Sequence, residues 1–198
     1  MEAAVLLASV AGFLHAVGYA QYARKVLVNA CRPNLASWLL WVALAMLNGV
    51  SYFAMSGDAV KSLISLVSTL GCITVFLLTL RHGRFSRLDI IDTFALVIGA
   101  GAILAWWKFG SATVANLLLQ GCIIISIIPT YRSVWRNPRA EQPSPWMLWA
   151  VAAALYVVVV LLRWQDNPAD LVYPVNSLLT AAGVLLLTFR TNHASPYR

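Results

Sequence analysis

The sequence predicts an all-α integral membrane protein with seven transmembrane helices, arranged as two parallel three-helix repeats joined by a linker helix. Three observations support this fold class: the composition, a series of seven long apolar runs, and a repeat within the chain. Of the 198 residues, 61% are apolar and only 11% are charged, whereas a soluble domain needs about a quarter of its residues charged. The composition therefore excludes a water-soluble domain.

Seven apolar runs follow one another along the chain, separated by charged residues or by glycine and proline. Because about 20 residues cross a bilayer as a helix, each run is long enough to span. The predicted spans are 4–23, 35–55, 59–80, 88–107, 112–131, 144–163 and 170–189. They divide the chain into a first three-helix bundle (1–83), a linker helix (84–110), a second three-helix bundle (111–190) and a cytoplasmic tail (191–198).

The distribution of basic residues predicts the orientation, because Lys and Arg concentrate on the cytoplasmic side of membrane proteins. With the N-terminus outside, 11 of the 14 basic residues fall in cytoplasmic segments, and only Lys61, Lys108 and Arg163 lie outside. The first apolar run lacks a positively charged leader, so we interpret it as a retained helix and not as a signal peptide. We expect an integral plasma-membrane protein, in a bacterial inner membrane, with its C-terminus in the cytoplasm.

The chain repeats itself. A shift of 108 aligns residues 24–50 with 132–158 and gives nine identities: Arg24 with Arg132, Val26 with Val134, Asn29 with Asn137, Trp38 with Trp146, Leu40 with Leu148, Trp41 with Trp149, Ala45 with Ala153, Leu47 with Leu155 and Val50 with Val158. A shift of 112 then places Asp58 on Asp170 and Gly71 on Gly183. Since each copy has three spans, the single helix between them keeps the copies parallel, related by an axis along the membrane normal.

The segments Gln21–Trp41 and Pro129–Trp149 both run from a helix end through a short basic loop into a helix that opens with aromatic residues. With the 3+1+3 helix plan, they resemble the SWEET and PQ-loop families of membrane transporters. The first copy has Ala20 and Gln21, and the second has Pro129 and Thr130, where those families carry a Pro-Gln dipeptide. Bacterial nicotinamide riboside transporters are similar in plan, so the substrate does not follow from the fold.

Polar side chains within the apolar runs predict the solute site, because a polar group at membrane depth needs a partner or a wet cavity. Helix geometry places residues of six helices near one depth, just outside the midplane. The predicted substrate-binding residues are Asn176, Asn48, Gln120, Tyr156, Ser65, Thr180 and His15. The resemblance to sugar transporters implies that Asn176 touches substrate, while the first copy has Ile64 or Ser65 at that place.

Each polar group also has a purely structural interpretation. Ser and Thr hydroxyls often bond to their own helix backbone, whereas the amides of Asn48, Gln120 and Asn176 need several partners and favour cavity lining. His15 could carry a proton or act as a structural hydrogen-bonding group. Asp89 and Asp92 are interpreted as a solvated helix start.

A gate is predicted at the cytoplasmic ends of the second and sixth spans. Trp41 and Trp149 lie one turn deeper than Trp38 and Trp146, which we interpret as interfacial anchors. Pro129 frees a backbone carbonyl and permits a kink, which suits a hinge. Gln21, in the loop motif of the first copy, belongs to the same predicted gate and hinge set.

The predicted function is transport of a small, uncharged polar solute, sugar-like or vitamin-like, by alternating access between the two bundles. A proton-coupled amino-acid transporter of the PQ-loop type and a seven-helix receptor of the same fold remain as alternatives. Enzyme motifs such as G-x-S-x-G, HExxH and CxxC are missing from the sequence. We expect no catalytic residues, metal, cofactor or nucleic acid, with the solute and the lipid bilayer as partners; a homo-oligomer stays open.

Overall fold

A computed structural model describes residues 1–30, 33, 35–83 and 90–190, and every regular element in this part of the chain is helical. The helices are α1 (Glu2–Leu27), α2 (Leu35–Ser56), α3 (Ala59–His82), α4 (Ile90–Phe109), α5 (Ala112–Ser126), α6 (Ile128–Arg136), α7 (Pro143–Leu162) and α8 (Val172–Thr188). Two short 3₁₀ turns, η1 (Pro138–Ala140) and η2 (Pro168–Leu171), precede α7 and α8. The predicted tail at 191–198 and the side chains of Asp89 and Asp92 lie outside the described residues.

Within the described residues, six helical segments are long and apolar enough to cross a membrane: Glu2–Leu27, Ser37–Ser56, Ala59–His82, Ala112–Arg136, Pro143–Leu162 and Pro168–Thr188. The chain is therefore an all-α protein of the transmembrane type. The helices begin and end close to the predicted positions. The largest extension in the first half is that of α1, which continues to Leu27 with Arg24 and Lys25 in its last turn, where cations stabilise the helix dipole.

The fifth predicted span, 112–131, differs from the structure in its shape and its end. Helix α5 ends at Ser126, a single turn residue follows at Ile127, and α6 continues to Arg136. Pro129 lies in the first turn of α6. Because proline has no N–H and its ring clashes with the carbonyl four residues earlier, a break in this position is expected. The kink predicted from Pro129 is thus present.

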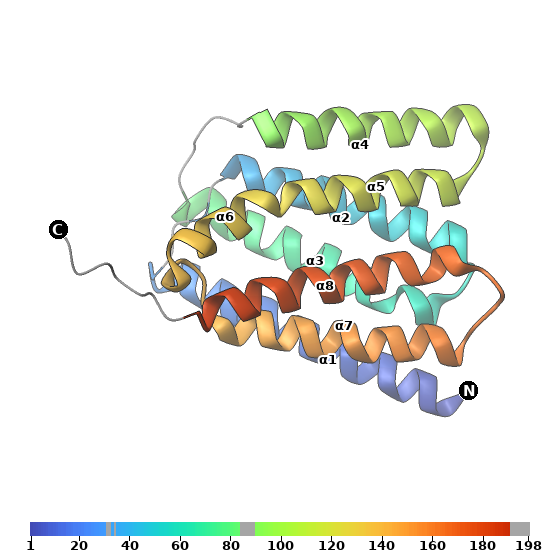
Figure 1. Ribbon diagram of the computed structural model, residues 1–198, viewed down its shortest axis with the longest axis horizontal. Coiled ribbons are helices and arrows are strands. Elements are labelled where there is room, and N and C mark those ends of the chain that lie inside the picture. The colour runs from blue at the N-terminus through green and yellow to red at the C-terminus, as the bar shows by residue number, and fades with distance from the viewer. Residues whose placement is uncertain (31–32, 34, 84–89, 191–198) are drawn as a thin grey trace.

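The helices lie side by side along the long axis of the molecule (Figure 1). One end holds Met1 and the α2–α3, α4–α5 and α7–α8 connections, and we call it the N-terminal end. The opposite end, with the α1–α2 and α6–α7 connections, is called the C-terminal end. At the N-terminal end, α2 stops because Gly57 adopts a φ of 60°, as glycine commonly does after a helix, and Asp58 caps α3.

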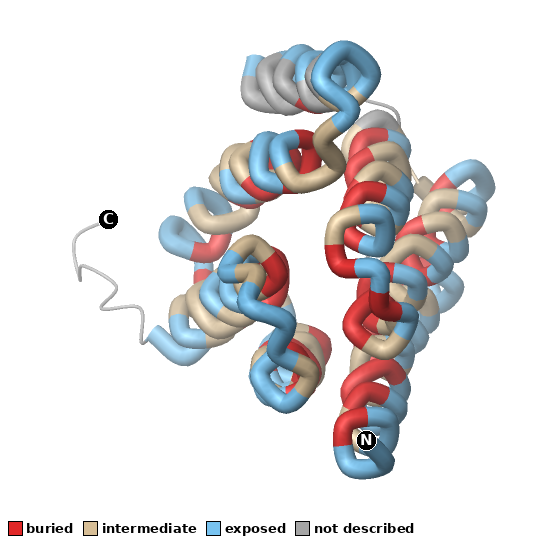
Figure 2. Tube along the Cα trace, turned by 90° about the vertical axis from the view of Figure 1, so that its right-hand side faces the viewer, coloured by how far each residue is buried: buried red, intermediate tan, exposed pale blue. Residues whose placement is uncertain are grey.

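The packing order is the same in the two halves of the chain. Helix α3 packs on both α1 and α2, and α8 packs on both α7 and the α5–α6 pair. The halves meet where α1 packs on α7 and where α2 packs on α5, while α4 packs mainly on α5. In Figure 2, which views the molecule from its N-terminal end, buried residues gather on the helix faces that are turned toward neighbouring helices.

A tyrosine packs against a glycine in each half. A side chain at Gly71 of α3 would collide with the ring of Tyr19, and a side chain at Gly183 of α8 would collide with Tyr131. Both the tyrosines and the glycines are 112 residues apart, the shift that also places Asp58 on Asp170. Glycine thus permits the same close approach of neighbouring helices in both halves.

Candidate functional site

A cavity of about 600 Å³ lies between the two halves, within the size range of small-molecule sites. Its deep wall includes Asn48 of α2 and Tyr173 of α8, and its mouth includes Pro33, Ala140 and Glu141 from the connections at the C-terminal end. The cavity therefore opens toward the C-terminal end of the bundle.

Aromatic rings form much of the wall near this mouth. Trp38 and Trp41 of α2 face the cavity, as do their repeat counterparts Trp146 and Trp149 of α7. The Trp146 and Trp149 ring centroids lie 5.2 Å apart with nearly perpendicular planes. The indole N–H of Trp146 donates to Glu141 Oε2 over 3.1 Å, and that of Trp149 donates to the backbone oxygen of His15 over 3.2 Å. Because both indole donors are bonded to protein, neither N–H group is free to bond a solute.

Glu141 is the one charged residue among the described residues that line the cavity. It precedes α7 and is half-buried. Burial raises the pKa of its carboxyl, while the hydrogen bond from Trp146 and the positive charge of Lys25 act in the opposite direction. Sequence reasoning missed this residue, and the only signal for it was a single acid within a basic loop.

Four buried amides form a network behind the cavity wall. Asn48 Oδ1 accepts from Asn116 Nδ2 over 3.2 Å and from Gln120 Nε2 over 2.8 Å. Gln120 Oε1 in turn accepts from Asn176 Nδ2 over 3.0 Å, and Asn176 Oδ1 accepts from Thr180 over 3.4 Å. The network joins α2 of the first half to α5 and α8 of the second. Of its members, Asn48 and Thr180 also line the cavity.

His15 lines the cavity from α1. Its Nε2 lies 2.7 Å from Ser68 Oγ of α3, and its ring packs edge-on against Tyr19. The other ring nitrogen, Nδ1, is buried and has no hydrogen-bond partner among the described residues. The imidazole is thus held by one hydroxyl and faces the same space as Asn48.

The polar residues expected near one depth do not form one cluster. Asn48, Gln120 and Asn176 meet in the amide network, but Ser65 Oγ donates to the Ser62 backbone oxygen of its own helix over 2.7 Å. Tyr156 packs against Tyr52 and Tyr173 beyond the cavity. Helix rise sets the depth of a residue but not its neighbours, and a hydroxyl can satisfy itself on its own backbone.

Only some of the predicted gate residues line the cavity. Trp41, Trp149 and Pro129 line the cavity. Gln21 instead lies away from it, where its Oε1 accepts a hydrogen bond from exposed Ser144 Oγ over 3.0 Å. This contact links α1 to the start of α7 across the two halves.

The N-terminal end of the bundle is closed by a buried ion pair. Lys61 Nζ of α3 lies 2.7 Å from Asp170 Oδ2 of η2, and the two side chains are 0% and 1% exposed. Asp170 Oδ1 also accepts from Asn167, and its backbone oxygen accepts from the hydroxyl of Tyr52 over 2.8 Å. Each partner of the ion pair belongs to a different half of the chain.

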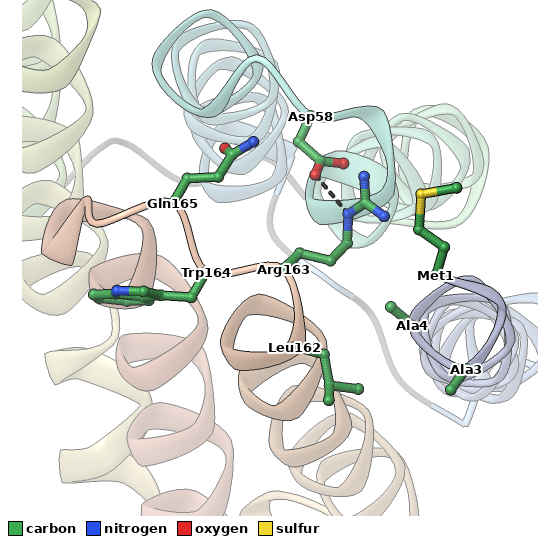
Figure 3. Close-up of a pocket in the computed structure, with 8 residues that line it drawn as sticks. All are labelled: Met1, Ala3, Ala4, Asp58, Leu162, Arg163, Trp164 and Gln165. Carbon is green, nitrogen blue, oxygen red and sulfur yellow. Dashed lines mark hydrogen bonds and ion pairs between the residues drawn. The ribbon is translucent and has the colours of Figure 1, made fainter.

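A second ion pair crosses the halves nearby. Arg163 Nε, at the end of α7, donates to Asp58 Oδ2 over 2.6 Å. The pair borders a hollow of about 280 Å³ that also reaches Met1 and Trp164 (Figure 3). Burial acts to raise the pKa of the Asp58 carboxyl, but the bond from Arg163 and the backbone N–H groups of Val60 and Lys61 outweigh it and lower the pKa.

Sequence reasoning placed Lys61 and Arg163 at the outer side but did not pair them with Asp58 or Asp170. A signal was available, because the shift of 112 aligns Asp58 with Asp170. Two equivalent acids, each before the third helix of its copy, indicate a shared role, although their cationic partners are not equivalent by the same shift.

Comparisons of the chain with protein-family models, with curated proteins and with solved structures find no match. Within the described residues, no group of three His, Cys, Asp or Glu side chains could hold a metal ion. The arrangement thus consists of a polar and aromatic cavity that is open at one end and sealed at the other by ion pairs between the halves. Such a cavity can admit a small solute from one side.

Proposed function

We propose that this protein is a membrane transporter that moves a small polar solute, sugar-like or vitamin-like, by alternating access. The observation that carries the proposal is the cavity between the two halves, open at the C-terminal end and closed at the N-terminal end by Lys61–Asp170 and Asp58–Arg163. Ion pairs that join two halves of a chain can form in one conformation and separate in another, as alternating access requires.

Seven transmembrane helices in two parallel three-helix repeats, joined by α4, form the proposed architecture. The identical packing order of the halves supports it, with α3 and α8 each in the middle of its set. The tyrosine–glycine contacts of Tyr19 with Gly71 and of Tyr131 with Gly183 give further support, because they are related by one shift. The resemblance to SWEET and PQ-loop proteins agrees with this plan.

The N-terminal end of the bundle is proposed to face outward. Arg24 and Lys25 end α1 at the C-terminal end, and Arg132, Arg136 and Arg139 lie near the same end. This bias favours a cytoplasmic position for the cavity mouth. The described conformation is then inward-facing, and the two ion pairs are the closed outer gate.

The position of the amide network is suited to a pivot for the proposed movement of the two halves. Asn48 lies eight residues before the end of α2, and Gln120 lies eight residues after the start of α5. By helix rise, both are about 12 Å from the helix ends at the N-terminal end of the bundle, so they meet at one depth. Their bond lies between the outer ion pairs and the aromatic mouth. A contact at this depth can persist while the ends of the halves separate on one side and close on the other.

Two-sided accessibility tests this function. Ser177 lines the cavity, so a Ser177→Cys variant with Cys31, Cys72 and Cys122 replaced by Ser should react with an impermeant maleimide from the cytoplasmic side. The double variant Asp58→Asn/Arg163→Gln should add reaction from the outer side. A receptor or a one-sided binding protein would give cytoplasmic labelling in both backgrounds, and that outcome would contradict transport.

Proton coupling is the second candidate mechanism, favoured by His15 in the cavity wall beside Ser68. A thermal-shift screen of sugars, amino acids, nucleosides and vitamins should first identify a solute. Uptake into proteoliposomes, with and without an inward proton gradient, then separates the mechanisms. We expect downhill movement that is nearly independent of the gradient; concentrative uptake that His15→Gln abolishes would identify His15 as the coupling site.

A further inference from the structure

The cavity wall carries a negative charge, whereas the bundle end at which the cavity opens is rich in basic residues. Basic residues predominate at the C-terminal end, yet the described residues that line the cavity include one carboxylate, Glu141, and neither Lys nor Arg. Lys25 acts electrostatically on Glu141 from α1 but is not among the lining residues. The lining is therefore suited to a positive charge and opposes a negative one.

Four tryptophans line the same cavity. Trp146 is bonded to Glu141, Trp149 lies against Trp146, and Trp38 and Trp41 stand on α2 as their repeat counterparts. The faces of indole rings attract cations, with a larger contribution where water is excluded. Rings whose N–H groups are already bonded offer a neutral solute few hydrogen bonds, whereas a cation needs only the faces and a carboxylate.

We infer that the cavity binds small organic ammonium cations, with the positive head near Glu141 and against the tryptophan rings that line the cavity. This assignment rests on the proposed transport function and replaces the uncharged solute that the sequence alone suggested. The hydroxyl and amide groups deeper in the cavity, such as those of Asn48 and Thr180, then contact the uncharged part of the solute. Burying a cation without a counter-charge is costly, and Glu141 supplies that charge.

The test compares isosteric ligands that differ in charge alone. Choline and 3,3-dimethylbutan-1-ol have the same shape, and so do phenyltrimethylammonium and tert-butylbenzene. Binding to the full chain in detergent is measured by isothermal titration calorimetry. We expect each cation to bind at least tenfold more tightly than its neutral isostere.

Variants assign the binding to the proposed place. Glu141→Gln removes the charge but keeps an oxygen acceptor for Trp146, and it should weaken choline binding about tenfold. Trp149→Leu should weaken it to a similar degree, and Trp41→Leu serves the same purpose if Trp149→Leu does not fold. The matched controls are Asp166→Asn and Trp164→Leu, because Trp164 Nε1 donates to Asp166 over 3.1 Å at the opposite end of the bundle. These controls should bind choline as the unmodified chain does.

Equal binding of the cation and its isostere, or no binding of either cation, would overturn the assignment. Unchanged choline affinity in Glu141→Gln would overturn it as well. Labelling of Ser177→Cys from the two sides does not depend on choline. Failure of the cation assignment is therefore distinguishable from failure of the transport proposal.

Discussion

The two ends of the cavity region are built from different interactions. At the N-terminal end, Lys61 and Asp170 pair in full burial, and Tyr52 bonds the Asp170 backbone. At the C-terminal end, aromatic rings line a cavity mouth, and the contact between Gln21 and Ser144 across the halves lies on the exposed surface. An ion pair is either formed or broken, whereas an aromatic ring face can contact different partners. The difference suits a closure at the N-terminal end that is either formed or broken, and an entrance at the C-terminal end that accepts different contacts.

Breaking the buried ion pair should have the largest effect on stability. Lys61→Met leaves Asp170 charged and buried, and we expect the free energy of unfolding to fall by about 3–5 kcal/mol. The double variant Lys61→Met/Asp170→Asn removes both charges and should recover most of that loss. Unfolding in mixed detergent micelles measures both variants. Equal instability of the single and double variants would show that the charges themselves are needed for folding.

The amide network should come next. Asn48→Ala removes one acceptor of Gln120 and one acceptor of Asn116, so we expect a loss of about 1–3 kcal/mol of stability. Because Asn48 also lines the cavity, solute binding should weaken as well. Ser65→Ala is the control, since Ser65 bonds only its own helix and its loss should cost less than about 0.5 kcal/mol. Similar losses in the two variants would contradict a special role for the network.

Asp58 should give a smaller, pH-dependent effect. Asp58→Asn keeps a helix-capping side chain but loses the ion pair with Arg163, at a cost of about 1 kcal/mol at neutral pH. Because the folded state lowers the pKa of Asp58, its stabilising contribution is present above the unfolded pKa of about 3.9 and is lost as the pH falls through the lower folded value. Stability of the unmodified chain should thus fall more steeply below pH 4 than that of Asp58→Asn. Parallel pH profiles would contradict this assignment.

The sequence predicted the helices to within a few residues because apolar runs and charged breaks are local signals. It predicted that the amides of Asn48, Gln120 and Asn176 line the cavity. In the structure Asn48 lines it, whereas Gln120 and Asn176 bond within the network behind its wall. The sequence did not predict that Lys61 meets Asp170. A charge at a helix end has the same local sequence whether it is hydrated or paired with a residue 109 positions away, so only tertiary packing distinguishes the two.

The position of Glu141 illustrates the same limit. The sequence analysis assigned only helix residues to the cavity wall. The predicted wall therefore contained amides, hydroxyls and rings but no carboxylate. In the structure, the segment between α6 and α7 returns to the mouth, and its acid joins the wall through Trp146. Whether a loop residue reaches a site depends on the path of the chain in three dimensions. Hydrophobic periodicity does not predict that path.

The smallest effect on stability, and the most direct probe of the entrance, is expected at Pro129. Pro129→Ala allows the missing backbone bond to the carbonyl of Ile125 to form and should straighten the α5–α6 junction at Ile127. The added bond and the lost rigidity of proline oppose each other, so we expect stability to change by less than about 1 kcal/mol. The junction borders the cavity, so a stiffer helix should slow maleimide labelling of Ser177→Cys from the cytoplasmic side several-fold. Pro143→Ala is the control, because Pro143 begins α7, where proline breaks no helical bond. If both substitutions leave the labelling rate unchanged, the break at Ile127 is a fixed bend, and the entrance must move elsewhere.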